Sequence, residues 1–190
     1  MIYICLNSGY PANGFAIRAG SNRLMTGGQL IGVSRIIEHP DFTDTPRMIN
    51  DIVILKLERT LILSAAVRAI LLPVAGFAVP HGSMATVTGW GGINQVGNAN
   101  PTVLQALNTA VIGNAQCTTI NNNVAPRADQ LCAGAVVGRD TCYRDEGAPL
   151  IFQGRLIGLV SWGFGPGCAV GRPIVYTRIS SFLPFITRNL

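Results

Sequence analysis

The chain has 190 residues, of which 48% are hydrophobic and only 12% charged, and it contains 22 glycines and 11 prolines. This composition excludes a disordered chain, disfavours a helical bundle and is typical of a globular all-β protein with many turns. The formal net charge of +5 comes from basic residues scattered singly along the chain, so we expect an ordinary solvated surface and no nucleic-acid partner.

The sequence indicates neither a membrane span nor a metal site. The longest apolar candidate, residues 65–79, is interrupted by Arg68, Pro73 and Gly76, which rules out a spanning helix. The apolar start, residues 1–6, is too short for a secretion signal and has no basic residue before it. The five cysteines form no Cys-x-x-Cys pair and no Cys/His cluster, so we expect no metal and no other cofactor.

Taken in chain order, the predicted elements are mostly strands. Alternating or continuous apolar runs predict five of them, at residues 15–20, 29–37, 52–57, 86–92 and 155–163. Residues 65–80 are punctuated by proline and glycine and predict a connecting segment. Near the end, Phe182, Phe185 and Ile186 recur at helical spacing, and Ser181 is the predicted N-cap of this helix.

One stretch, residues 138–152, concentrates unusual features. It places Asp140, Cys142, Asp145 and Glu146 within seven residues and follows them with Gly-Ala-Pro and an apolar run. Three of the nine acidic residues of the chain therefore lie on one short segment. Glycine and proline so close together predict a tight loop with unusual backbone angles.

This stretch resembles the nucleophile loop of the chymotrypsin-like (trypsin-like) serine proteases, which reads Asp-Ser-Cys-x-Gly-Asp-Ser-Gly-Gly-Pro-Leu. Further motifs of that family occur in the same order along the chain, at residues 18–21, 50–57, 67–73, 89–91, 161–163 and 173–178. The resemblance implies an all-β fold of two antiparallel six-stranded β-barrels, with the first barrel incomplete here, and a C-terminal helix.

The resemblance also implies a division of the single protease domain, residues 1–190. Residues 1–64 would be the remnant of the first barrel and residues 65–80 the connector between the barrels. Residues 81–179 would form the second barrel, and residues 180–190 the closing helix. The upstream stretch that holds the activation cleavage site of the family has no counterpart in the sequence.

The catalytic triad of the family aligns with three positions, and two of them differ. Asp51 holds the position of the aspartate that orients the catalytic histidine. Ile4 stands at the histidine position and Glu146 at the position of the nucleophilic serine. Isoleucine cannot transfer a proton, and a carboxylate attacks amides poorly. The two histidines, His39 and His81, both fall in predicted turns, so the sequence offers no substitute base.

The oxyanion loop differs as well. Arg144 stands where the family has the glycine whose N–H helps to form the oxyanion hole, and a side chain there makes the required backbone turn harder. Asp145 matches the aspartate that pairs with the N-terminus released on activation. Glu146 is either one solvated acid on an unused turn or, with Arg144 and Asp145, part of a charged recognition patch. We expect repulsion between Glu146 and Asp51.

The specificity pocket of the family maps onto two further segments. Asp140 sits where a trypsin-like enzyme binds the Lys or Arg of its substrate. Ile174 replaces a wall glycine, so we expect it to fill the passage to Asp140, while Arg144 neutralises that carboxylate. The remaining wall is implied at Ser161, Trp162 and Gly163.

The cysteine spacings match two disulfides of the family, Cys117–Cys132 and Cys142–Cys168. Such bonds persist in oxidising compartments, so the resemblance implies a secreted, extracellular protein. Cys5 would have its partner in an upstream segment. We expect a monomer that binds a protein or peptide partner.

Two functional interpretations follow. The first is a catalytically inactive serine protease homologue, secreted as a binding or regulatory protein. The alternative is an active trypsin-like serine endopeptidase whose sequence is truncated or mis-annotated. A third interpretation is that the chain lacks the strands it needs to fold stably, since missing strands expose sheet edges and core.

Overall fold

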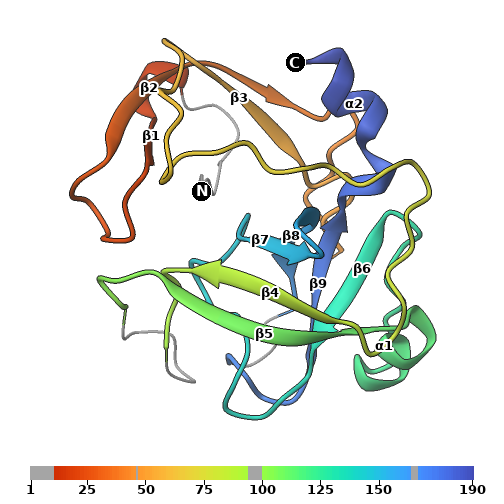
Figure 1. Ribbon diagram of the computed structural model, residues 1–190. Coiled ribbons are helices and arrows are strands. Elements are labelled where there is room, and N and C mark those ends of the chain that lie inside the picture. Colours follow the sequence, from red (N-terminus) through yellow and green to blue (C-terminus); the bar gives the residue numbers. More distant parts are fainter. Residues whose placement is uncertain (1–10, 46, 94–99, 164–166) are drawn as a thin grey trace.

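The computed structural model describes residues 11–45, 47–93, 100–163 and 167–190, and its two sheets are drawn in Figure 1. The first sheet has three strands, β1 (Ala16–Ala19), β2 (Gln29–Glu38) and β3 (Val53–Leu57), paired antiparallel in the order β1-β2-β3. Ile17, Ile31 and Val33 alternate inward along β1 and β2 and form its core with Val67. The strands predicted at residues 15–20, 29–37 and 52–57 are therefore confirmed.

The second sheet is a closed barrel of six antiparallel strands in the order β4-β5-β6-β9-β8-β7. The core of the barrel is apolar, with Leu150, Val160, Ile174 and Tyr176 each at most 2% exposed. Closure pairs every strand on both sides, so the barrel has no free edge. The strands are β4 (Met84–Gly89), β5 (Gln105–Ile112), β6 (Gln130–Gly134), β7 (Pro149–Phe152), β8 (Arg155–Trp162) and β9 (Pro173–Arg178).

Helices are few and short. A 3₁₀ turn, η1 (Ala12–Gly14), precedes β1, and α1 (Asn114–Ile120) follows β5. At the end of the chain, η2 (Ile179–Ser181) leads into α2 (Leu183–Arg188), the predicted C-terminal helix. This helix is shorter than the closing helix expected at residues 180–190, because η2 takes up the first of those residues. None of the described helices is long and apolar enough to cross a membrane.

The predicted capping of α2 is wrong. Ser181 belongs to η2, and Phe182 occupies the N-cap position without a side-chain capping bond. Phe182 is 5% exposed and packs with Ile52, which precedes β3, and with Ile179. Burial of this aromatic ring fixes where the helix begins, because it contributes more to stability than one hydroxyl cap.

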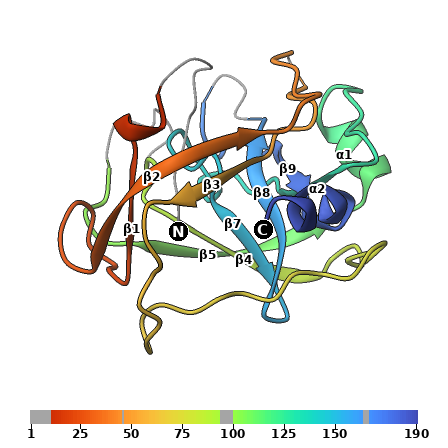
Figure 2. The same cartoon turned by 90° about the horizontal axis from the view of Figure 1, so that it is seen from above.

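A connecting segment, residues 58–83, joins β3 to β4 without a named strand and spans the molecule in yellow (Figures 1 and 2). It docks on the barrel where Leu71 forms a parallel bridge with Arg155. The Arg155 guanidinium donates a 3.0 Å hydrogen bond to the carbonyl oxygen of Leu72. The first sheet and the barrel are thereby tied together beside β8.

Both implied disulfides are present. Cys117 in α1 is bonded to Cys132 in β6, and Cys142 is bonded to Cys168. The second bond links the loop before β7 to the loop before β9, so it fixes the two segments that carry the candidate site relative to each other.

Candidate functional site

Asp51 lies at the junction between the first sheet and the barrel. The hydroxyl of Ser161, in β8, donates a 2.6 Å hydrogen bond to its Oδ2, and the hydroxyl of Thr177, in β9, donates a 2.7 Å bond to its backbone carbonyl. Burial raises the pKa of the Asp51 carboxyl, the Ser161 hydrogen bond opposes that rise, and the charge of Asp44 adds to it. The expected repulsion between Glu146 and Asp51 stays a prediction.

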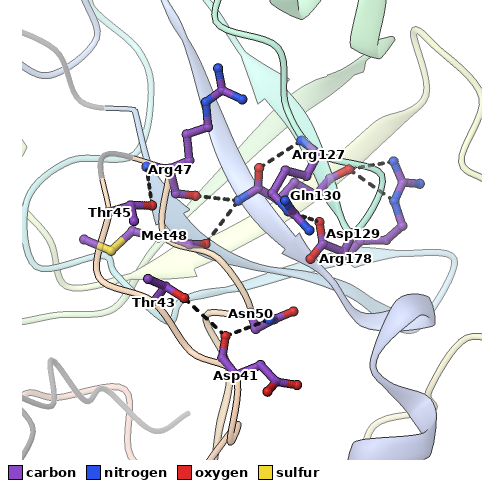
Figure 3. Close-up of polar contacts among 10 residues, drawn as sticks. All are labelled: Asp41, Thr43, Thr45, Arg47, Met48, Asn50, Arg127, Asp129, Gln130 and Arg178. Atoms are coloured by element: carbon purple, nitrogen blue, oxygen red, sulfur yellow. Dashed lines mark hydrogen bonds and ion pairs between the residues drawn. The ribbon is translucent and has the colours of Figure 1, made fainter.

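The loop that carries Asp51 is held against the barrel by one buried amide. Figure 3 shows Gln130, 3% exposed, pointing into the loop between β2 and β3. Its Nε2 donates to the carbonyl oxygens of Arg47 and Met48, at 2.8 and 3.2 Å, and its Oε1 accepts the N–H of Arg127. All polar atoms of the amide side chain are therefore used to place the segment that leads into Asp51.

The loop before β7 closes on itself. Arg144 has a positive φ of 75°, and its backbone N–H donates a 2.8 Å hydrogen bond to Oε2 of Glu146. The expectation that a side chain would hinder this turn is only partly right, because the turn forms with arginine in the left-handed region, at a cost of about 1 kcal/mol. Glu146 is half-buried and thus more than a solvated surface acid.

Asp145 turns inward rather than outward. It is 8% exposed, its Oδ1 accepts the N–H of Gly91 at 2.9 Å, and its Oδ2 accepts the N–H of Cys142 at 3.1 Å. A Cβ at Gly91 would lie about 2.3 Å from the carboxylate, so the glycine is required for this approach. Asp145 therefore cannot belong to an exposed charged patch. The alternative of a patch formed by Arg144, Asp145 and Glu146 is wrong for Asp145.

Asp140 is bound by backbone rather than by arginine. Its Oδ2 accepts the N–H of Ala135 and its Oδ1 the N–H of Thr141, both at 2.9 Å. Burial raises the pKa of Asp140 to about 6, against the lowering effect of these two bonds. Within the described ranges the single ion pair joins Arg127 to Asp129, so the expected neutralisation of Asp140 by Arg144 is not found.

Ile174 and the expected pocket wall lie on neighbouring strands. Ile174 in β9 is 2% exposed and belongs to the barrel core. Ser161 and Trp162 end β8, and Gly163 follows them with a φ of 121°. A Cβ on Gly163 would approach the backbone of Pro173 and Ile174 to 3.0 and 3.4 Å. The two chains are therefore packed closely at this point, with no room for a further side chain.

A cavity of about 370 Å³ reaches Asp140 from another direction. Its lining includes both Asp140 and Asp145, together with Gly91, Leu107 and Cys168. Of the described residues that line it, none belongs to the expected wall at residues 161–163 or 174. The open approach to the buried carboxylates thus comes from the side of β4 and β5.

Neither described histidine is placed at Asp51. His39 packs its ring against Phe182 and Phe185, and its Nδ1 accepts the N–H of Asp41. His81 accepts the N–H of Gly113. Ile4 and Cys5 fall outside the described residues. No group of three or more His, Cys, Asp or Glu side chains suited to a metal occurs in the described part of the chain.

The arrangement of barrel, disulfides and loop can be compared with known proteins. The family model described as Trypsin matches residues 5–186. The chain belongs to the trypsin family. Its relatives include a trypsin of Phaedon cochleariae, 36% identical over 97% of this chain and 72% of that protein.

Two further members show how widely the similarity extends. A vitellin-degrading protease of Bombyx mori is 36% identical over 98% of this chain and 70% of its own length. The solved structure of mouse neuropsin, a serine protease expressed in the limbic system, superposes with a TM-score of 0.83 at 26% identity, covering 92% of this chain and 78% of that one. The trypsin fold predicted from the motifs is confirmed.

Sequence reasoning missed Thr177 and Gln130 and gave Ser161 a different role. Ser161 is expected as pocket wall, yet its hydroxyl binds Asp51. Thr177 and Gln130 come from β9 and β6, more than 75 residues from the loop that they hold. Nothing in local periodicity signals such contacts, because they depend on how the barrel meets the first sheet.

Proposed function

We propose that this member of the trypsin family is catalytically inactive and acts as a secreted binding or regulatory protein for a protein or peptide partner. The observation that supports it most is the 2.8 Å hydrogen bond from the N–H of Arg144 to the carboxylate of Glu146. In the alignment of motifs these residues stand at the oxyanion-hole glycine and the nucleophilic serine. This one hydrogen bond therefore joins the position of the oxyanion-hole donor to the position of the nucleophile.

The proposal follows from what a peptidase needs at that loop. Acyl transfer requires a nucleophile, a base to accept its proton, and N–H donors that are open to the developing oxyanion. Here the Arg144 N–H is already bound to a side chain, and that side chain is negative. A second negative oxygen would be repelled from the same place, so transition-state stabilisation would fail even if substrate bound.

Substrate binding is also disfavoured. Asp140 retains the acid that would bind a basic side chain, but its two carboxylate oxygens already accept the N–H groups of Ala135 and Thr141. Ile174 brings a four-carbon side chain into the barrel core where the motif has glycine. With isoleucine at the base position, Ile4, we infer that a substrate would meet no proton acceptor, even if the cavity beside β4 and β5 admits it to Asp140.

Secretion is supported by the two disulfides, which need an oxidising compartment to persist. A binding role is what the fold offers once hydrolysis is removed, because the loops at the junction of the two sheets remain ordered by Gln130 and by the bond between Cys142 and Cys168. We propose a monomer that needs no cofactor.

The alternative is an active trypsin-like endopeptidase whose printed sequence departs from the true one. The names of the relatives favour it, since proteins 34 and 36% identical to this chain are called trypsins. Sequencing the complete transcript distinguishes the two. A serine codon at position 146 and an upstream Ala-Ala-His-Cys would support the enzyme, while Glu146 and Ile4 in the transcript would support the homologue.

The direct test is hydrolysis of an arginyl peptide amide by the purified full-length protein and by its Asp51→Ala variant. We expect both proteins to hydrolyse the peptide at the background rate of the buffer, because neither has a nucleophile. Hydrolysis by the wild-type protein that is abolished in Asp51→Ala would overturn the proposal, since removal of the aspartate of a working triad costs about ten-thousand-fold in turnover.

A further inference from the structure

A second cavity, of about 620 Å³, has neither Glu146 nor Asp51 in its lining. It is lined by the loop between β1 and β2 and by residues next to the ends of β4 and β5. Arg18 and Arg23 line it from the loop side, and Trp90 and Leu104 line it from the barrel side. Volumes of 300–1,000 Å³ are usual for sites that bind small organic molecules.

The charge of this cavity is uniformly positive. Its lining contains two arginines and no aspartate or glutamate. Neither Arg18 nor Arg23 forms an ion pair with a described residue. The Arg18 guanidinium donates one hydrogen bond to the carbonyl oxygen of Gly27, which leaves most of its five N–H groups available. An anion is the ligand that this charge would attract.

The backbone on either side of Arg23 is held in place before any ligand arrives. The N–H of Leu24 donates to the carbonyl oxygen of Thr102 at 2.8 Å, and the N–H of Leu104 donates to that of Asn22 at 2.7 Å. Arg23 lies between these two hydrogen bonds and forms an isolated antiparallel β-bridge with Val103. A site that is ordered in advance loses less conformational entropy when it binds.

The loop that carries Arg23 turns tightly beside the cavity. Met25, Gly27 and Gly28 all have positive φ, of 65°, 71° and 61°. A Cβ at Gly28 would come within 2.2 Å of the carbonyl oxygen of Ala19, so this position accepts glycine alone.

We propose that this cavity binds a small ring-shaped molecule, such as a sugar, that carries a sulfate or phosphate ester. The guanidinium groups of Arg18 and Arg23 bind the ester oxygens, with support from the hydroxyl of Thr26. The indole of Trp90 and the side chain of Leu104 contact the ring. The cavity is larger than an inorganic ion would fill, which assigns the site to an organic sulfate or phosphate ester. This site is independent of Glu146 and of whether the protein hydrolyses peptides.

Calorimetric titration of the full-length protein tests the assignment with four probes: glucose 6-sulfate, glucose 6-phosphate, inorganic sulfate and glucose. We expect saturable binding of the two esters, weaker binding of sulfate and none of glucose. The relative affinity of the two esters decides which group the site prefers. Binding of glucose as tight as that of the esters, or of inorganic sulfate as tight as that of the esters, would overturn the proposal, as would the absence of binding.

Two variants locate the site. Arg23→Gln should weaken ester binding about tenfold or more, as expected for the loss of a charge-assisted hydrogen bond. Arg18→Gln should weaken it similarly. Arg188→Gln in α2 removes the same charge far from the cavity and should leave binding unchanged. Because Arg23 is exposed, its replacement leaves the fold intact. Equal affinities of the Arg23→Gln and Arg188→Gln proteins would contradict the site.

Discussion

The backbone N–H of Arg144 donates its hydrogen bond to the carboxylate of a residue only two positions further along the chain, Glu146. In a trypsin-family loop this short connection joins the positions of the oxyanion hole and of the nucleophile. The left-handed φ of Arg144 and the half-buried Glu146 carboxylate therefore have to be considered as one unit.

The first prediction concerns the carboxylate of this unit. Glu146→Ala should lower the free energy of unfolding by about 1 kcal/mol, because the Arg144 N–H loses a charged acceptor. Urea denaturation measures the change, with Glu38→Ala as the control, since Glu38 is an exposed acid on β2. Equal destabilisation by the two substitutions would show that the bond contributes nothing.

The second prediction concerns the backbone. Arg144→Gly should raise the free energy of unfolding by about 1 kcal/mol, because glycine adopts a φ of 75° without the steric cost that a Cβ imposes. Arg139→Gly serves as control, because Arg139 is exposed on the same loop and has no positive φ. If Arg144→Gly is no more stable than Arg139→Gly, the left-handed turn is not strained.

The third prediction concerns pH. The pKa of Asp140 is about 6 in the folded protein against 3.8 ordinarily, so the folded state holds its proton to higher pH than the unfolded chain does. Stability should therefore fall as pH rises from 4 to 7, by up to about 3 kcal/mol from this group. Asp140→Asn should remove that part of the dependence.

The control for Asp140→Asn is Asp129→Asn, which removes an acid that is paired with Arg127 near the surface. Urea denaturation at pH 4, 5, 6 and 7 gives the difference in free energy of unfolding between each variant and the wild type. This difference in stability should grow with pH for Asp140→Asn only. Parallel pH curves for wild type and Asp140→Asn would contradict the buried, raised pKa.

The fourth prediction concerns the amide that holds the loop of Asp51. Gln130→Ala should destabilise the protein by about 2 kcal/mol, because the carbonyl groups of Arg47 and Met48 lose their donor. Amide hydrogen exchange should also become faster at residues 47–50. Gln105→Ala is the matched control, since Gln105 is exposed and its amide bonds only Val103 nearby. Unchanged exchange at residues 47–50 would show that Gln130 does not order the loop.

Much of the fold could be predicted from the sequence, because strands leave local patterns. The alternation of buried and exposed residues in β4 and the apolar run of β8 mark strands wherever they pair. The disulfides could be inferred from spacing only through the resemblance to the family. The N-cap of α2 was mispredicted because the burial of Phe182 outweighs local capping by Ser181.

The site was less predictable, because its contacts depend on torsions and on distant pairs. Whether Asp145 points in or out depends on the close approach allowed by Gly91. The bond between Ser161 and Asp51 joins residues 110 positions apart. Likewise, no pattern announces that Glu146 turns back to the N–H of Arg144 rather than out to solvent. Residue types alone could not give these directions.

Reaction with a serine-directed fluorophosphonate tests the central claim most directly. The purified full-length protein is incubated with the probe beside an active trypsin, and labelled peptides are mapped by mass spectrometry. The account predicts a label on the nucleophilic serine of the active enzyme and none on residues 138–152 of this chain. A covalent label on that loop of the folded protein would contradict it.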